Sequence, residues 1–372
     1  MNEAPAQAGP IAVYGATGYT GRLVGAELRR RGARVILAGR NLAKLEIVAE
    51  DLGGDVEVRA APLDDSTALS DLLEPCTAVI ACAGPFRDHG EPVLAAAVDA
   101  RTHYLDTTGE QPFMRLVFED YGPRAERRGV ALVTAMGFDY APGDMIAALT
   151  AEAMGPLDEI VLAYAVRGFS ATRGTLLSAL GLMAGGDLEW RDGELGPAPR
   201  GIGGGTWEFP DPIGRQRMLR YPAGEQITVP RHVDTPRVRT LITAPTVIPF
   251  PLLPRAAPVA MIPFQMAMRT PLRRAVAGLV TRLPEGPSIE SRRASRFTIV
   301  CEARQGSRRR RGTVTGSDLY GLTARTTVEG AISCAAPGFD RAGALAPAQA
   351  FDPREFMRSL RDFGVEHEVV PV

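Results

Sequence analysis

The feature that most constrains the fold is a glycine-rich turn directly after the first apolar run, Ile11–Tyr14. The turn consists of Gly15, Ala16, Thr17, Gly18, Tyr19, Thr20 and Gly21. In this GxxGxxG spacing the first glycine permits a sharp turn, the second lets backbone approach a pyrophosphate, and the third lets the next helix pack on the strand. N–H groups at the start of that helix then bind phosphate oxygens. The segment therefore predicts a Rossmann-type dinucleotide site.

Short apolar runs alternate with helical patterns along the first third of the chain. The runs are Ile11–Tyr14, Arg34–Ala38, Val56–Ala60, Ala78–Cys82, His103–Leu105 and Val130–Thr134. Helical patterns lie between them at Gly21–Arg31, Leu42–Leu52 and Pro92–Ala100. Apolar runs of this length are typical of parallel strands buried on both faces, and their alternation with helices predicts a doubly wound α/β sheet.

A second domain is expected, because 372 residues exceed one core of ordinary size and the pattern changes near Gly137. We predict a Rossmann domain at 1–136, joined by a carboxy-terminal segment, 350–372, that contains a helix at Pro353–Phe363. The intervening 137–349 is predicted to be an α+β domain with a mixed or antiparallel sheet, used for substrate binding and dimerisation.

The end of the second predicted strand indicates which dinucleotide binds. NAD-binding domains usually place Asp or Glu there for the ribose 2′-hydroxyl. This chain has Arg40 and Asn41 and no carboxylate. Arg40 can pair with a 2′-phosphate, and Lys44, one helical turn later, can reach the same group. We therefore predict NADP(H); the missing acid carries more weight than Arg40, because arginine is abundant here and Lys44 is the only lysine.

The order of the strands places the other cofactor contacts, because ligands bind at the carboxyl ends of strands in such sheets. Asp64 follows the third strand and is expected beside the adenine. Residues after the fourth and sixth strands are expected beside the ribose and the nicotinamide: Ala83, Gly84, Pro85, Phe86, Gly137 and Phe138.

Asp106 and Tyr140 are the candidate proton-transfer residues, because both follow strands whose ends face the predicted nicotinamide. Each has a structural alternative. Asp106 can hold its loop by accepting hydrogen bonds from Thr107 and Thr108 N–H groups, and Tyr140 can pack against the nicotinamide. His89 is a third candidate, with a solvated loop position as its alternative.

Composition and spacing argue against several classes of function. The net charge of −1 is too low for a nucleic-acid partner. The four histidines and four cysteines show no HxxxH, HExxH or CxxC spacing, so we predict no metal site. Because the only lysine has Arg40 four residues before it, the Tyr-xxx-Lys pair of short-chain dehydrogenases cannot form. Arg167 and Arg173 remain as groups that could bind a substrate anion.

The apolar stretch Leu241–Met268 is interrupted by prolines and therefore is not predicted to span a membrane. It is interpreted as a buried wall or dimer surface, or alternatively as an apolar substrate groove or a membrane-touching loop. The first ten residues contain no basic segment followed by an apolar run, so a cytoplasmic protein is expected.

An ordered set of motifs resembles the saccharopine dehydrogenase-like oxidoreductases, in particular their trans-acting enoyl reductase branch. The motifs are VYGATGYTG (Val13–Gly21), LAGRN (Leu37–Asn41), GPF (Gly84–Phe86), THYLDTTGE (Thr102–Glu110), MGFDYAPGD (Met136–Asp144), Tyr221–Pro230 and GSDLYGLTA (Gly316–Ala324). The resemblance implies a Rossmann domain, a second α/β domain and a carboxy-terminal helix that returns to the first. Related sequences often have a small residue where Tyr140 stands, so the substrate is not carried over.

The resemblance implies an NADP(H)-dependent enzyme of bacterial type that transfers a hydride to an unsaturated, enoyl lipid or polyketide intermediate, free or carrier-bound. Two alternatives stay open: an imine reductase or amino-acid dehydrogenase of the saccharopine type, and a non-catalytic NADP sensor. A homodimer and peripheral membrane contact are further expectations.

Overall fold

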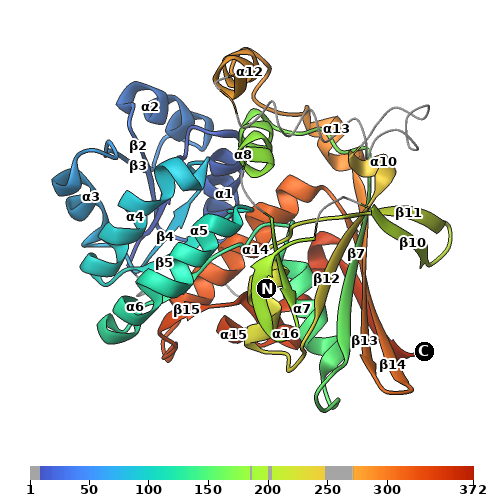
Figure 1. Cartoon of the computed structure of the whole chain (residues 1–372). Coiled ribbons are helices and arrows are strands. Elements are labelled where there is room, and N and C mark those ends of the chain that lie inside the picture. Colours follow the sequence, from blue (N-terminus) through green and yellow to red (C-terminus); the bar gives the residue numbers. More distant parts are fainter. Residues whose placement is uncertain (1–8, 185–186, 200–202, 248–269, 271) are drawn as a thin grey trace. The chain divides into compact units, whose positions relative to one another are not determined.

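The computed structural model describes residues 9–184, 187–199, 203–247, 270 and 272–372. The chain forms two compact units (Figure 1). Unit 1 contains Met1–Ala141 and Tyr320–Phe363, and unit 2 contains Pro142–Leu319 and Gly364–Val372.

Unit 1 is built on a parallel sheet of seven strands in the order β15-β6-β5-β4-β1-β2-β3. The strands are β1 (Ile11–Tyr14), β2 (Val35–Gly39), β3 (Glu57–Ala60), β4 (Ala78–Ala81), β5 (His103–Asp106), β6 (Ala131–Val133) and β15 (Gly343–Leu345). The predicted doubly wound sheet is confirmed. Two details differ: β3 is an edge strand that is only partly buried, and β15 is a seventh strand that the sequence pattern did not reveal.

Helices cover both faces of this sheet, as buried parallel strands require. They are α1 (Tyr19–Arg30), α2 (Leu42–Asp51), α3 (Ser66–Leu73), α4 (Phe86–Ala100), α5 (Gln111–Leu116), α6 (Gly122–Arg128), α14 (Leu319–Cys334), α15 (Pro347–Ala350) and α16 (Pro353–Ser359). A π-turn at Val117–Tyr121 joins α5 and α6, and a 3₁₀ turn at Arg361–Phe363 follows α16. One face packs on α3, α4 and α6, where Tyr14, Ile36 and Val79 lie in a shared apolar core.

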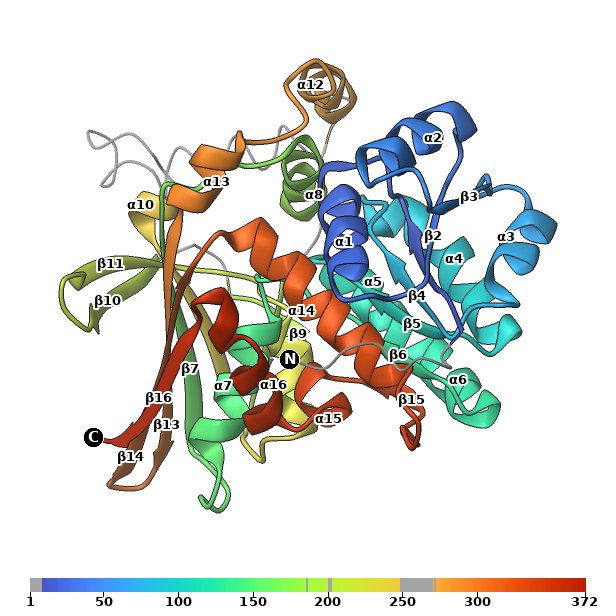
Figure 2. The same ribbon diagram turned by 180° about the vertical axis from the view of Figure 1, so that it is seen from behind.

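The opposite face of unit 1 carries α1 and α14, which lie side by side in Figure 2. A buried ion pair joins them, with Arg31 Nη2 2.9 Å from Glu329 Oε2. Arg325 of α14 also donates to Glu27 of α1 at 2.8 Å. These contacts correct the predicted boundary at 349: residues 320–349 belong to the Rossmann unit, because α14 packs on it as an extra covering helix.

Unit 2 contains a mixed sheet of seven strands in the order β10-β11-β12-β7-β13-β14-β16. These are β7 (Glu159–Arg167), β10 (Gly203–Phe209), β11 (Gly214–Arg220), β12 (Val238–Thr243), β13 (Arg296–Gln305), β14 (Arg308–Ser317) and β16 (Glu366–Pro371). Only the β12–β7 pair is parallel among these paired strands. The predicted mixed sheet is confirmed.

The other elements of unit 2 are the hairpin β8 (Leu188–Arg191) and β9 (Glu194–Pro197), with α7 (Ala141–Ala151), α8 (Arg173–Ala184), α9 (Glu225–Thr228), a 3₁₀ turn (Val229–Arg231), α10 (Ala244–Val247), α12 (Leu272–Val280) and α13 (Ile289–Ala294). Helix α7 lies on one face of the sheet, because a Cβ at Gly312 would meet Ile146 and Thr150 of that helix.

The prediction that residues 350–372 join the Rossmann domain is correct only up to Phe363. The helix at Pro353 forms and belongs to unit 1, but the last residues leave it and form β16 at the edge of the second sheet. A helix cannot continue there, since Gly364 has a φ of 82° and the following residues alternate in burial as a strand does. Of the apolar stretch from Leu241, residues 241–247 form the end of β12 and α10, and 248–268 lie outside the described residues.

Candidate functional site

The glycine turn between β1 and α1 has the geometry that its spacing predicts. Gly15 has a φ of 82°, and a Cβ there would lie 2.9 Å from Ala83 N. A Cβ on Gly21 would lie 2.8 Å from Ala16 Cα and closer still to Gly15 O, so the helix can approach the strand only with glycine. Gly18 is exposed and is the N-cap of α1, with no side chain capping the helix. The amides at this helix start are therefore suited to phosphate oxygens.

Parallel pairing brings the predicted cofactor residues to one edge of the sheet. β1 pairs in register with β2 and β4, and β4 pairs with β5, so the ends at Tyr14, Gly39, Ala81 and Asp106 are neighbours. The turn at Gly15–Gly21 and the segments that follow the other strands start from this edge. Strand order thus brings together residues as far apart in the sequence as Tyr14 and Asp106.

Arg40 and Lys44 are exposed at the adenosine end of this edge. Burial raises the pKa of the nearby Tyr14 phenol to about 12; the charge of Arg40 lowers this pKa and that of Asp64 raises it. Arg40 and Asp64 therefore both lie near Tyr14 at the end of β1. Asn41 has a structural role, because its Oδ1 accepts a hydrogen bond from Lys44 N at 3.0 Å and caps α2.

Asp106 is fully buried at the end of β5. Its carboxylate fixes the backbone that follows β5 and β6 by accepting hydrogen bonds. Its Oδ1 accepts hydrogen bonds from Ala135 N at 2.9 Å and Thr108 N at 3.0 Å, and Thr134 Oγ1 donates at 3.0 Å. Ala135 has a φ of 62°, a left-handed conformation that costs an alanine about 1–2 kcal/mol. Burial raises the pKa of Asp106 to about 6, although these hydrogen bonds oppose the shift.

The loop after β6 is held against α14 within unit 1. Phe138 N donates to Thr323 Oγ1 at 3.0 Å, and Tyr140 OH donates to Gly109 O at 3.1 Å. Both Phe138 and Tyr140 are buried. Asp139, between them, is the exposed member of this loop, yet desolvation by the surrounding protein raises its pKa to about 6. Asp139 is not among the residues predicted for the site, although it lies inside the MGFDYAPGD motif.

Glu110 is a second residue that the sequence analysis did not assign. It is 3% exposed, and its carboxylate accepts hydrogen bonds from Phe86 N at 2.9 Å and Arg87 N at 3.0 Å. It therefore satisfies the first amides of α4, directly after the cis Gly84–Pro85 peptide. This contact explains why α4 begins at Phe86, six residues before the predicted start at Pro92. It also corrects the loop alternative for His89, which is exposed on the first turns of α4.

Arg167 and Arg173 both lie in unit 2 but differ in their contacts. Arg173 Nη1 donates to Thr281 O at 3.0 Å, and its Nη2 lies 3.4 Å from Glu285. Arg167 is exposed at the end of β7.

Unit 2 also contains two buried polar pairs. His232 Nε2 lies 2.9 Å from Asp144 Oδ1, and Tyr164 donates a hydrogen bond to Glu225. Asp144 and Glu225 are fully buried. A Cβ on Gly143 would collide with the Tyr164 and Glu225 side chains, so this backbone is fixed tightly against β7 and α9.

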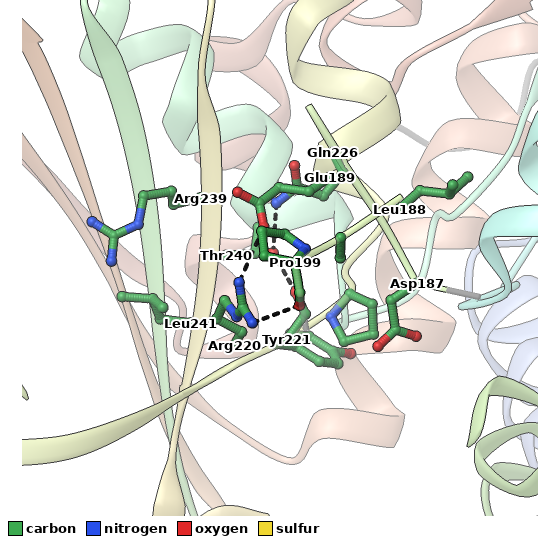
Figure 3. Close-up of a pocket in the computed structure, with 12 residues that line it drawn as sticks. Asp187, Leu188, Glu189, Pro199, Arg220, Tyr221, Gln226, Arg239, Thr240 and Leu241 are labelled. Carbon is green, nitrogen blue, oxygen red and sulfur yellow. Dashed lines mark hydrogen bonds and ion pairs between the residues drawn. The ribbon is translucent and has the colours of Figure 1, made fainter. Parts of the chain in front are cut away.

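A small pocket of about 50 Å³ lies beside β11 and β12 in unit 2 (Figure 3). Its polar side chains already bind one another or the backbone. Arg220 donates to Pro199 O at 2.7 Å, and Gln226 donates to Thr240 Oγ1 at 2.9 Å. This volume suits one or two water molecules rather than a substrate.

Two absences hold for the described part of the chain. No group of three or more His, Cys, Asp or Glu side chains there could hold a metal ion. No helix there has both the length and the apolar character needed to cross a membrane.

Two relatives each match 36% of this chain. A trans-acting enoyl reductase of Mycobacterium ulcerans (strain Agy99) is 35% identical over 140 residues, which are 36% of this chain and 34% of that protein. A saccharopine dehydrogenase-like oxidoreductase of Homo sapiens is 30% identical over 152 residues, 36% of this chain and 35% of that protein. The match thus spans about a third of each relative's own length.

The fold of the whole chain has a solved counterpart. Apo saccharopine dehydrogenase (L-Glu forming) from Saccharomyces cerevisiae aligns over 98% of this chain and 100% of that chain, with a TM-score of 0.59 and 13% identity. At this identity the likeness shows the fold alone. Residues 11–133 match the family described as the saccharopine dehydrogenase NADP binding domain. Together with the open glycine turn and the exposed Arg40, this match shows that residues 11–133 are similar to the NADP-binding domain of the saccharopine dehydrogenase family.

Proposed function

We propose that this protein is an NADPH-dependent reductase that delivers a hydride to the C=C bond of an enoyl lipid or polyketide intermediate. The observation that carries the proposal is the NADP-binding domain match over residues 11–133. The enoyl substrate class is supported by relatives named trans-acting enoyl reductase that are 35–36% identical over 140 residues.

Different residues at the sheet edge would bind different parts of the cofactor. The Gly15–Gly21 turn and the start of α1 would hold the pyrophosphate, and Arg40 with Lys44 would hold the 2′-phosphate. Segment 83–86, fixed by Glu110, would follow the ribose, and Gly137–Phe138 would border the nicotinamide. The cofactor supplies the hydride, while the protein orients the cofactor and donates one proton to the substrate.

We assign the proton to Asp139 and a positioning role to Asp106. A general acid must reach the substrate and must hold a proton near the working pH. Asp139 has an exposed side chain and a pKa of about 6, whereas Asp106 is fully buried and accepts hydrogen bonds from Thr108, Thr134 and Ala135. The hydrogen bond from Tyr140 to Gly109 O likewise favours a positioning role for Tyr140 over proton donation.

NADPH oxidation with a panel of substrates tests the proposal. The purified protein is expected to turn over at least one enoyl thioester or enone. Turnover of imines alone would instead support a saccharopine-type imine reductase or amino-acid dehydrogenase, for which the shared fold is the supporting observation. Tight NADPH binding with no turnover on any class would support a non-catalytic sensor.

The proposal also covers the cellular location, the oligomeric state and the membrane contact of the enzyme. We infer a cytoplasmic enzyme of bacterial type that works as a homodimer on a lipid-like substrate, free or carrier-bound, with peripheral membrane contact through the apolar 241–268 segment. The support is the scattered, free cysteines and the apolar, proline-interrupted character of that segment. Sedimentation of the protein alone and with liposomes measures the dimer and the membrane contact.

A further inference from the structure

We propose that unit 2 carries an anion-binding site formed by Arg167 and Arg296, which takes a phosphate or carboxylate group. Arg167 ends β7, Arg296 begins β13, and the two are direct partners in the antiparallel register. Partners in such a pair point to the same face of the sheet, and like charges placed opposite each other are destabilising. The register therefore places two arginine side chains opposite each other on one face of the sheet, and a bound anion would lower the energetic cost of this arrangement.

The two arginines are not neutralised within the protein. Among the described residues, neither has a carboxylate within ion-pair distance, although many other arginines of the chain do. Arg296 Nη1 donates to Arg293 O and Ser295 O at 2.7 and 2.9 Å. Its Nε and Nη2 make no hydrogen bond to the described residues, which leaves a donor edge that can bind an oxyanion.

The arginines border a cavity of about 420 Å³, within the range of small-molecule sites. Ser317 is the register partner of Arg296 on β14, and the next row of the same face contains Thr298 and Thr315. Hydroxyl groups thus form the floor beside the two guanidinium groups. Pro212 and Ile213, from the β10–β11 turn, add an apolar wall.

The charges around the cavity limit what it can hold. Glu366 of β16 also borders it, as the register partner of Thr315 on the side away from Arg167. With two arginines and one glutamate, the lining has a net charge of +1. A ligand with one anionic group at the arginines and a hydrogen-bond donor toward Glu366 fits this distribution.

Thermal unfolding of the full chain tests the site. The midpoint is measured against inorganic phosphate or acetate at constant ionic strength, with chloride as the reference, and with and without saturating NADPH. NADPH occupies the Gly15–Gly21 turn, the other phosphate-binding candidate, so a response that persists with NADPH belongs elsewhere. This design keeps the site separate from the proposed reductase activity, because substrate turnover is not measured.

Two variants and a matched control decide the outcome. R167Q and R296Q are expected to weaken the anion response at least fivefold and, in chloride, to raise the unfolding midpoint by relieving the repulsion. R309Q removes an exposed arginine of β14 that does not border the cavity, and it should leave the response unchanged. Equal responses in all four proteins would mean an adventitious ion only and would overturn the proposal, as would no response in the wild type. A stronger response to phosphate than to acetate identifies a phosphate-bearing ligand, and the reverse a carboxylate.

Discussion

At the residue scale, Asp106 and Asp139 show how surroundings separate two similar carboxyl groups. Desolvation by the surrounding protein raises the pKa of each to about 6. Asp106 has no exposed surface, and it supports the left-handed backbone at Ala135. Asp139 reaches solvent, so the same pKa makes it a usable proton donor.

Replacing Asp106 with Asn should change how stability depends on pH. The folded chain retains the Asp106 proton up to about pH 6, and the unfolded chain releases it near the ordinary aspartate value of 3.8. The folded state therefore binds more protons in this window, so this group's contribution to stability falls as pH rises from about 4 to 6. The loss is at most about 3 kcal/mol.

Urea unfolding of the wild type and Asp106→Asn at several pH values measures this effect. The stability of the variant relative to the wild type should increase between pH 4 and 6 and stay constant above. A difference that does not change with pH would contradict the assigned titration.

Asp139→Asn should lower the rate of NADPH-dependent reduction about 100-fold, a typical contribution of general acid catalysis. The wild-type rate should fall above pH 6, where Asp139 loses its proton, and the residual rate of the variant should lack this dependence. Asp120→Asn, which removes an exposed acid from the π-turn, is the control. If both variants retained the wild-type pH profile, another group or water would be the donor.

Arg40→Asp should weaken NADPH binding about 100-fold, because it replaces a charge-assisted hydrogen-bonding partner with a like charge. NADH binding should weaken less or improve, since an acid at this place suits a ribose 2′-hydroxyl. Arg34→Asp changes an exposed arginine just before the opposite end of β2 and should bind NADPH normally. Fluorescence titration measures all three; unchanged NADPH affinity in Arg40→Asp would refute the role of Arg40.

At the scale of elements, the approach of α1 to β1 depends on Gly21. A Cβ there would overlap Gly15 O and Ala16 Cα, so Gly21→Ala should destabilise unit 1 by about 2 kcal/mol and weaken NADPH binding. Gly278→Ala is the matched control, because this glycine of α12 has open space around its Cα. Its alanine variant should be equal to the wild type or more stable by up to about 1 kcal/mol. Thermal unfolding distinguishes the two; a Gly21→Ala protein as stable as the wild type would show that α1 can shift.

The start of α4 shows why element boundaries were harder to predict than the elements. Pro92 lacks an N–H, so the sequence pattern favours a helix that begins near it. The helix starts six residues earlier because Glu110, 24 positions away, satisfies the amide of Phe86. No local pattern could reveal this contact, since it depends on the parallel pairing of β4 and β5.

At the scale of the whole molecule, the chain returns twice to units it had left. α14 brings residues 320–334 into unit 1, and β16 adds residues 366–371 to the sheet of unit 2. Deleting 364–372 should expose the β14 edge and lower the unfolding midpoint of unit 2 by several degrees. NADPH affinity should stay near the wild-type value, because unit 1 ends at Phe363.

Calorimetry and NADPH titration of this truncated chain, beside a chain that lacks Val372 alone, measure both effects. The single-residue deletion removes only the hydrogen bond from Val372 N to Arg309 O, keeps all the residue pairs of β14 with β16, and should leave the midpoint almost unchanged. Equal midpoints for the two truncations would show that β16 adds little to the stability of the sheet.

The sequence by itself determined the features that arise from local periodicity and backbone sterics. The glycine spacing, the apolar strands and the missing acid before Asn41 predicted the sheet, its turn and NADP(H), since each depends on residues close together in the chain. Tertiary structure decided which unit α14 and β16 join, the separate surroundings of Asp106 and Asp139, the capping role of Glu110 and the pairing of Arg167 with Arg296. These features depend on strand order and register, which bring distant residues into contact and so decide whether a charge is buried, paired or exposed.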